Sequence, residues 1–267
     1  MLDALDKDTL LNNIHFPSTT AEFAVQSELF SRGGHNPLRG CVSAIDGIAL
    51  RIRRPRVCEV PNRSSYWTRK GFFAINAQAT VGGDYQVHFL STVTAGSCHD
   101  STAFSASGLA ELLAREDGLP RGYWVAGDDA YIAAERLLTP WPGNNLLWEK
   151  DAFNYYHSSS RTSVEQVFGQ IVGRWGTLWS SIRFSVSRAS LILRVCARLH
   201  NCLGARNCPA VDALLPQDGT GGIGEVIMQD QCDLDDRLRQ HRRDREPCPL
   251  RVALTRRLKE LQCRRPA

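Results

Sequence analysis

The stretch VSAIDGIALRI (residues 42–52) has the pattern of a buried β-strand that carries one acidic residue. Side chains two positions apart in a strand point to the same side, so Asp46 shares a face with apolar neighbours. These neighbours are Ala44, Ile48, Leu50 and Ile52. An unpaired carboxylate on such a face is costly, and it has to be neutralised, hydrogen-bonded or bound to a metal ion. The alternative is a hairpin turn at Asp46-Gly47, because Asp-Gly is a strong hairpin signal.

Two more acidic residues stand in structured contexts further along the chain. Asp128 follows a short apolar run at 124–126, which is typical of a buried strand. Glu165 lies at the edge of an apolar stripe with the 3.6-residue period of a helix. The stripe consists of Val164, Val167, Phe168, Ile171, Val172, Trp175 and Leu178. An alternative for Glu165 is a capping box with Thr162 at a helix start. Carboxylates that meet from three distant segments suit two divalent cations and phosphoryl transfer.

Five sequence motifs follow one another in a fixed order around these acidic residues. They are GCVSAIDGIALRIRRP (40–55), YWTRKGFFAINAQATV (66–81), AGSCHDSTAF (95–104), VAGDDAYIAAERLLTP (125–140) and FNYYHSSSRTSVEQVFGQIVGRW (153–175). Over roughly residues 15–205, this order resembles the DDE superfamily endonucleases of Harbinger-type transposases.

The resemblance implies a ribonuclease H-like α/β fold, in which a mixed sheet is flanked by helices. It also implies that Asp46, Asp128 and Glu165 are catalytic residues that hold two Mg2+ or Mn2+ ions. Asp100 matches a further acidic position of the family and is a candidate metal ligand. The alternative for Asp100 is an ordinary cap of the helix that follows it. Carboxylates suit these ions because Mg2+ is a hard cation that prefers oxygen ligands.

The order of the remaining elements agrees with that fold. Two β-rich runs at 71–81 and 85–94 surround a Gly-Gly-Asp turn, which predicts a hairpin. A helix is expected from Asp100-Ser101, followed by the short strand that ends before Asp128. Three regions follow from these patterns. They are an N-terminal remnant or lead-in at 1–40, the endonuclease domain at 41–206, and a charged, partly disordered appendage at 207–267 that contains a short basic amphipathic helix, interpreted as a solvated surface helix.

A cluster of basic residues follows the first predicted strand. It consists of Arg51, Arg53, Arg54, Arg56, Arg63, Arg69 and Lys70. Phosphate contacts from such a patch give salt-dependent binding that depends little on DNA sequence. These residues are therefore candidate DNA contacts, and the alternative is a solvated charged loop.

The composition limits the class of protein. With 267 residues and 43% hydrophobic content, the chain can bury one sizeable core. The formal net charge is +4, and nearly all of the 32 basic residues are Arg, which is suited to phosphate contact. The nine Cys residues are scattered without a Cys-x-x-Cys pair, so neither a disulfide framework nor a zinc ribbon is expected. No signal peptide or membrane-spanning run is recognised, so a soluble, intracellular protein is expected. The resemblance implies that it lies in the nucleus.

The sequence therefore predicts a metal-dependent DNA endonuclease of transposase origin, with a strand-transfer step left open. The competing hypothesis is a catalytically silent DNA- or protein-binding module that keeps the fold. Harbinger-type enzymes generally act with a Myb-like DNA-binding protein, so the resemblance implies such a partner. Assembly into oligomers is left open.

Overall fold

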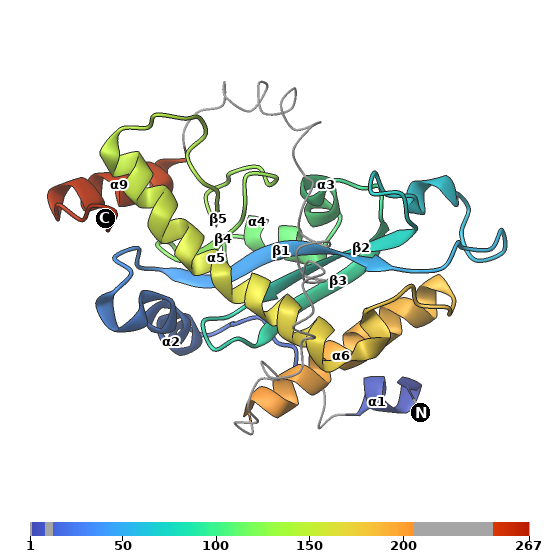
Figure 1. Ribbon diagram of the computed structural model, residues 1–267. Helices are drawn as coiled ribbons and strands as arrows, with labels where there is room; N and C mark the ends of the chain where they lie inside the picture. The colour runs from blue at the N-terminus through green and yellow to red at the C-terminus, as the bar shows by residue number, and fades with distance from the viewer. Residues whose placement is uncertain (1, 9–12, 206–247, 267) are drawn as a thin grey trace, which may run out of the picture.

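The computed structural model describes residues 2–8, 13–205 and 248–266. Its centre is a five-stranded sheet with the order β3-β2-β1-β4-β5 (Figure 1). The strands are β1 (Cys41–Arg51), β2 (Ala74–Val81), β3 (Val87–Ala95), β4 (Trp124–Ala126) and β5 (Leu137–Leu138). The first three strands are antiparallel, whereas β4 and β5 run parallel to β1. This mixed sheet confirms the predicted ribonuclease H-like fold class.

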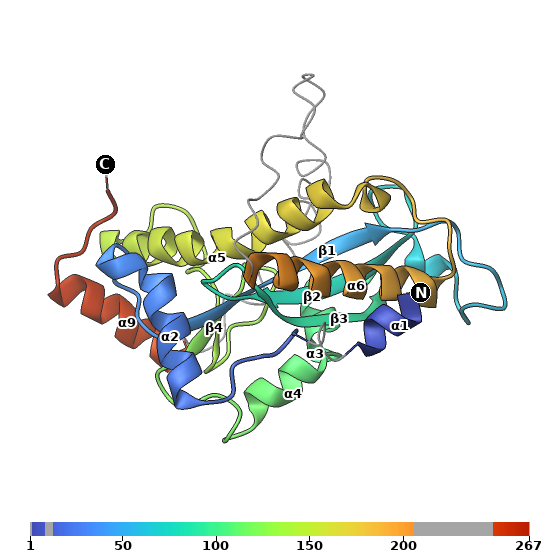
Figure 2. The same cartoon turned by 90° about the horizontal axis from the view of Figure 1, so that it is seen from below.

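Helices cover both faces of the sheet. The helices are α1 (Leu2–Lys7), α2 (Thr20–Ser31), α3 (Asp100–Ser105), α4 (Gly108–Ala114), α5 (Trp148–Arg174), α6 (Val186–Ala205) and α9 (Pro249–Glu260). Short 3-10 turns occur at η2 (Arg32–Gly34), η3 (Ser64–Tyr66) and η4 (Gly176–Leu178). Helix α5 lies on one face of the sheet, and α3 and α4 lie on the other (Figure 2). None of the helices within the described ranges combines the length and apolar character needed to cross a bilayer.

Strand β1 separates two apolar cores. Ala44, Ile48 and Leu50 belong to the core that includes α5 and α6, whereas Val42 and Ile45 belong to the core that includes α4. From Ala44 onward this division follows the two-residue alternation of a strand whose faces are both covered, and the register shift between Cys41 and Ser43 places Val42 on the other face. The hairpin alternative for Asp46-Gly47 is wrong, because β1 continues through both residues with Asp46 opposite Ala79 and Gly47 opposite Gln78.

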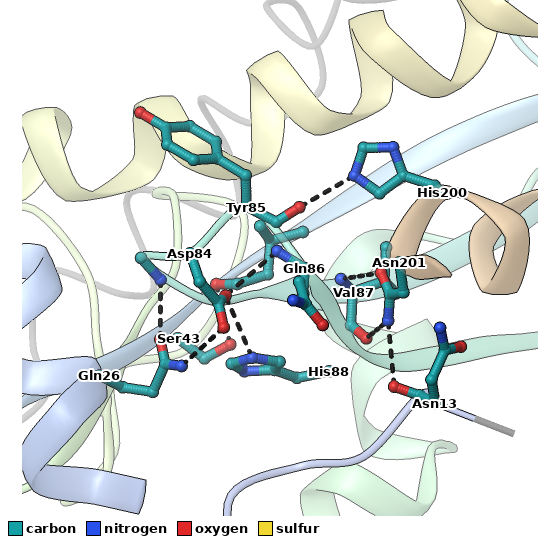
Figure 3. A network of polar contacts seen from close by, with 12 residues as sticks. Asn13, Gln26, Ser43, Asp84, Tyr85, Gln86, Val87, His88, His200 and Asn201 are labelled. Atoms are coloured by element: carbon teal, nitrogen blue, oxygen red, sulfur yellow. Dashed lines mark hydrogen bonds and ion pairs between the residues drawn. The ribbon is translucent and has the colours of Figure 1, made fainter. Parts of the chain in front are cut away.

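The β2–β3 hairpin is fixed at its turn by two helices (Figure 3). From α2, the Gln26 amide donates to Asp84 Oδ2 at 3.0 Å and accepts from the Gly83 backbone at 2.9 Å. From α6, the Asn201 amide makes two 2.8 Å hydrogen bonds with the backbone of Val87. Buried backbone groups need such partners, and these contacts fix the turn and the start of β3 against α2 and α6.

The C-terminal helix α9 packs against α5 and the segment that follows β5. Arg251 is buried, and its Nη1 donates to the backbone oxygens of Thr139 at 3.2 Å and Pro140 at 3.1 Å. Trp141 Nε1 donates to Thr255 Oγ1 on α9 at 2.9 Å. One face of this helix is therefore buried, and the interpretation as a solvated surface helix holds only for its exposed residues, which include Arg256, Arg257 and Lys259. The disorder predicted in the appendage concerns residues 207–247, which lie outside the described residues.

Candidate active site

Asp46 and Asp128 lie at the same edge of two adjacent strands. Strands β1 and β4 are parallel, with Ala44 paired to Ala126. Each acidic residue stands two positions beyond this pair, in the same direction along the sheet. Both side chains are buried, with residue exposures of 8% for Asp46 and 7% for Asp128. The strand register thus brings together two carboxylates from distant parts of the sequence.

The surroundings of these two carboxylates disfavour their charged forms. Burial raises the pKa of Asp46, and the charge of Asp128 raises it further, whereas Arg161 lowers it. Burial also raises the pKa of Asp128; Arg161 opposes this shift, and the charges of Asp100 and Asp129 add to it. Each carboxylate accepts one backbone hydrogen bond, Asp46 from Gly47 at 2.8 Å and Asp128 from Ala130 at 3.0 Å. A bound cation would stabilise the charged forms of both carboxylates, which burial and mutual repulsion otherwise disfavour.

Glu165 reaches the same region from α5, but not from the start of the helix. Helix α5 begins at Trp148, so Glu165 lies in its interior. The capping-box alternative is therefore wrong, and Thr162 Oγ1 instead donates to the carbonyl of Ser158 at 3.3 Å. The Glu165 side chain is 42% exposed and accepts a hydrogen bond from Arg161 Nη2 at 3.3 Å.

Arg161 is a charged residue of this site that the sequence reasoning missed. Its Nη2 atom lies 4.0 Å from Asp46 Oδ2 and 3.3 Å from Glu165 Oε1. The signal in the sequence is the four-residue spacing of Arg161 and Glu165, which places the two side chains side by side on a helix. The contact with Asp46 depends on how α5 packs on β1, and spacing does not reveal it.

Asp100 lies on the α3 side of the sheet and does not act as the helix cap. It is the first residue of α3, and the cap position belongs to His99. Asp100 Oδ1 instead accepts hydrogen bonds from Asn76 at 3.0 Å and from Gln78 at 2.7 Å. A Cβ atom added at Gly47 would lie only 2.3 Å from the same oxygen. Asp100 therefore packs against Gly47 of β1, next to Asp46, and its Oδ1 atom already accepts two hydrogen bonds.

Asn76, Gln78 and Tyr131 complete this support, and the sequence reasoning missed them as well. Gln78 is buried between Asp100, to which it donates, and the Tyr131 hydroxyl, from which it accepts. The available signal is the alternation of polar Asn76 and Gln78 with alanines in a strand that is buried along its whole length. Polar side chains at such positions need specific partners.

The ligand atoms around Asp46 are of the kind that a hard divalent cation prefers, but they are not arranged as a metal site. The donors are carboxylate oxygens, which Mg2+ and Mn2+ prefer. In the part of the chain that the structure describes, however, no three Asp, Glu, His or Cys side chains are placed closely enough to hold a metal ion. Arg161 instead lies beside two of these carboxylates, Asp46 and Glu165.

The predicted DNA contacts differ in their solvent exposure. Arg51, Arg54, Arg56 and Arg69 are exposed, and Arg53, Arg63 and Lys70 are partly buried. The guanidinium of Arg53 pairs with Glu59 and donates to the Arg183 carbonyl at 3.1 Å, so it fixes the loop after β1. Arg69 Nη2 lies 2.8 Å from His99 Nε2, next to Asp100. The cluster therefore extends from the end of β1 to the start of α3.

Comparisons with known proteins bear on this arrangement. The family model described as DDE superfamily endonuclease matches residues 45–201, more than half of the chain. A mouse protein described as "Putative nuclease HARBI1" is 28% identical over 191 residues, which are 70% of this chain and 52% of the mouse protein. A rat protein with the same description is 26% identical over 192 residues, with the same coverage. The chain thus spans about half the length of these curated relatives. No solved structure matches it.

Proposed function

The chain belongs to the DDE superfamily endonucleases, and on that premise we propose that it is a divalent-metal-dependent nuclease of transposase origin that cleaves DNA phosphodiester bonds. The observation that carries the proposal is the burial of Asp46 and Asp128 side by side at one edge of parallel strands. Two buried carboxylates without full compensation are costly in a merely structural role. They are useful where a cation has to be held.

Asp46, Asp128 and Glu165 are proposed as the catalytic carboxylates. Bound Mg2+ or Mn2+ would supply an activated water and stabilise the charge that develops on the phosphate. Asp46 Oδ1 and Asp128 Oδ1 accept hydrogen bonds from the backbone N–H groups of Gly47 and Ala130, which orient the two carboxylates, and Asp46 Oδ2 faces Arg161. Glu165 is the carboxylate of the three with the most exposed side chain, so it can approach substrate from the solvent side. Asp100 is proposed as a supporting residue and a secondary ligand candidate.

DNA is the proposed substrate, and the exposed arginines of the cluster after β1 are its proposed contacts. Arg51, Arg54, Arg56 and Arg69 have the exposure needed to reach phosphates, whereas Arg53 and Lys70 are partly buried. A nuclear location and a Myb-like DNA-binding partner are proposed from the family resemblance alone. Strand transfer is a further proposal that needs its own assay.

The test is cleavage of labelled double-stranded DNA in EDTA, Mg2+ and Mn2+. Asp46→Asn and Asp128→Asn should each lower metal-dependent nicking by at least about a hundredfold, because each removes a proposed metal ligand. Asp117→Asn makes the same change of charge at an exposed ion pair and should leave nicking unchanged. Equal nicking by the unmodified protein and Asp46→Asn would contradict the proposal and point to a contaminating nuclease.

A catalytically silent binding module is the second candidate. It is favoured by the finding that, within the described residues, no three ligating side chains are arranged for a metal ion. The two candidates differ in metal-linked stability, because a ligand that binds only the folded state raises its stability. An Mn2+-dependent rise in melting temperature that Asp46→Asn abolishes supports the nuclease. Salt-sensitive DNA binding without such a rise supports the silent module.

A further inference from the structure

We infer that Arg161 is an internal counter-ion that competes with divalent cations, so that its guanidinium has to leave Asp46 before a metal ion can bind there. The inference rests on the proposed function, because it concerns the same carboxylates. It assigns a role to a residue outside the carboxylate triad. Arg161 is therefore a positioning residue that sets how readily the site is loaded.

The position of α5 carries the first part of the argument. This helix crosses the face of β1 (Figure 1), and the two elements are in contact. Arg161 Nη2 lies 4.0 Å from Asp46 Oδ2 and 3.3 Å from Glu165 Oε1. A single nitrogen thus serves two of the three proposed catalytic carboxylates, and its charge also acts on Asp128. Arg161 thus supplies positive charge to carboxylates that would otherwise bind a cation.

Charge repulsion carries the second part. A divalent cation bound to Asp46 Oδ2 would lie about 2 Å from that oxygen. The guanidinium nitrogen lies 4.0 Å from the same atom. A cation on this oxygen and the guanidinium nitrogen would therefore lie at most about 6 Å apart, and two positive centres so close repel each other because the interior screens charge less than water does. The present place of Arg161 and an occupied metal site therefore oppose each other.

The state of the surrounding groups carries the third part. Glu165 points to Arg161, and the described residues include no ready set of three ligands. The Nε atom of Arg161 is buried and has no hydrogen-bond partner among the described residues. The side chain is therefore held mainly by the carboxylate charges, and its departure relieves an unpaired donor. The side chain of Glu165 is 42% exposed, whereas that of Arg161 is 17% exposed. Arg161 can therefore leave Asp46 by moving toward the solvent beside Glu165.

The experiment measures Mn2+ binding without DNA, by following free Mn2+ in a titration by electron paramagnetic resonance. Arg161→Gln removes the charge and is expected to bind Mn2+ on the order of tenfold more tightly than the unmodified protein. Arg161→Lys keeps the charge and is expected to remain near the unmodified affinity. Arg115→Gln loses the same charge at an exposed pair with Asp117 and should show no change.

Each outcome decides between the proposals. An Mn2+ affinity of folded Arg161→Gln that equals or falls below that of the unmodified protein overturns the inference and leaves the proposed function standing. Mn2+ binding that survives Asp46→Asn places the ion elsewhere and overturns the inference as well. Absence of binding in every protein overturns both proposals.

A measurement on the unmodified protein covers the case in which Arg161→Gln does not fold. Arginine Nε–Hε signals are followed by nuclear magnetic resonance while diamagnetic Mg2+ is added, and the Arg161 signal is assigned from its loss in Arg161→Lys. The inference expects this signal to shift and to exchange faster with solvent as the ion binds. A signal that stays in place while Mg2+ demonstrably binds overturns it.

Discussion

At the scale of single residues, the buried His157 makes the stability of the fold depend on pH. It lies in the core, donates from Nε2 to the Leu138 carbonyl at 2.9 Å, and stacks on the rings of Trp124 and Phe153. Burial, helped by the charges of Arg161 and Arg251 and opposed by the hydrogen bond to Leu138, lowers its pKa from 6.5 to about 4. The unfolded chain therefore binds more protons than the folded one between pH 6.5 and 4. Stability is full above pH 6.5 and falls as the pH drops through this window.

We expect this histidine to contribute up to about 3 kcal/mol to the acid-dependent loss of unfolding free energy. Urea unfolding at pH 7.5, 6 and 5 measures it. His157→Gln should flatten the slope in this window, even if the variant is less stable at every pH. His35→Gln changes an exposed histidine and should keep the slope. An identical slope in His157→Gln would show that other groups cause the acid sensitivity.

Two glycines are expected to respond to the same substitution in opposite directions. A Cβ at Gly169 meets nothing within 4 Å, and the residue is exposed in the interior of α5, so Gly169→Ala should stabilise the fold by about 0.5–1 kcal/mol. A Cβ at Gly47 would lie 2.3 Å from Asp100 Oδ1 and 2.5 Å from Gln78 Nε2. Gly47→Ala should therefore cost about 1–3 kcal/mol in chemical denaturation. Equal effects of the two changes would contradict the close packing of Asp100 on β1.

The same residues show how far the sequence could predict the site. Asp46 was predictable because strand alternation places it on an apolar face, and Asp128 because it ends a short buried run. Arg161, Asn76 and Gln78 were not predictable as parts of the site. Their contacts depend on the register of β1 against β2 and on the packing of α5 across the sheet. Such pairings join residues far apart in the chain and leave no local pattern.

At the scale of elements, α5 shows tertiary packing overriding a weak local signal. Its apolar stripe predicted a helix over residues 164–178, whereas α5 begins at Trp148, has 27 residues and ends at Arg174, and Leu178 lies in η4. The first half of α5 contains three consecutive serines, and serine is a weak helix former. Phe153 and His157 are nevertheless buried against the sheet, and this contact stabilises the first half.

Helix α9 provides the prediction at this scale. Arg251→Met should lower the free energy of unfolding by roughly 2–4 kcal/mol, because it leaves buried carbonyls of Thr139 and Pro140 without their donor and removes the guanidinium stacked 4.2 Å from the Trp141 ring. Arg256→Met changes an exposed residue of the same helix and should have little effect. Urea denaturation measures both. Equal stability of the two variants would mean that α9 contributes little to the folded state.

At the scale of the whole molecule, the net charge is only +4, so the proposed DNA affinity would depend on where the arginines lie on the surface. The exposed pair Arg54 and Arg56 extends from the loop after β1. Arg54→Gln and Arg56→Gln should each weaken binding for all sequences alike and reduce the slope of log affinity against log salt by about 1. Fluorescence anisotropy at several salt concentrations measures the slope, with Arg115→Gln as the control. An unchanged slope would remove these residues from the proposed DNA contacts.

The pairing of β1 with β4 has a consequence for protein synthesis. Asp46 and Asp128 become neighbours only when a strand made late is inserted beside a strand made early, and Glu165 arrives later still. A chain emerging from the ribosome can complete the β1–β2–β3 hairpins well before it holds a second acidic ligand. Unfinished chains therefore cannot cut nucleic acid by the proposed chemistry, which requires that the chain be translated through Glu165 and that α5 pack on the sheet.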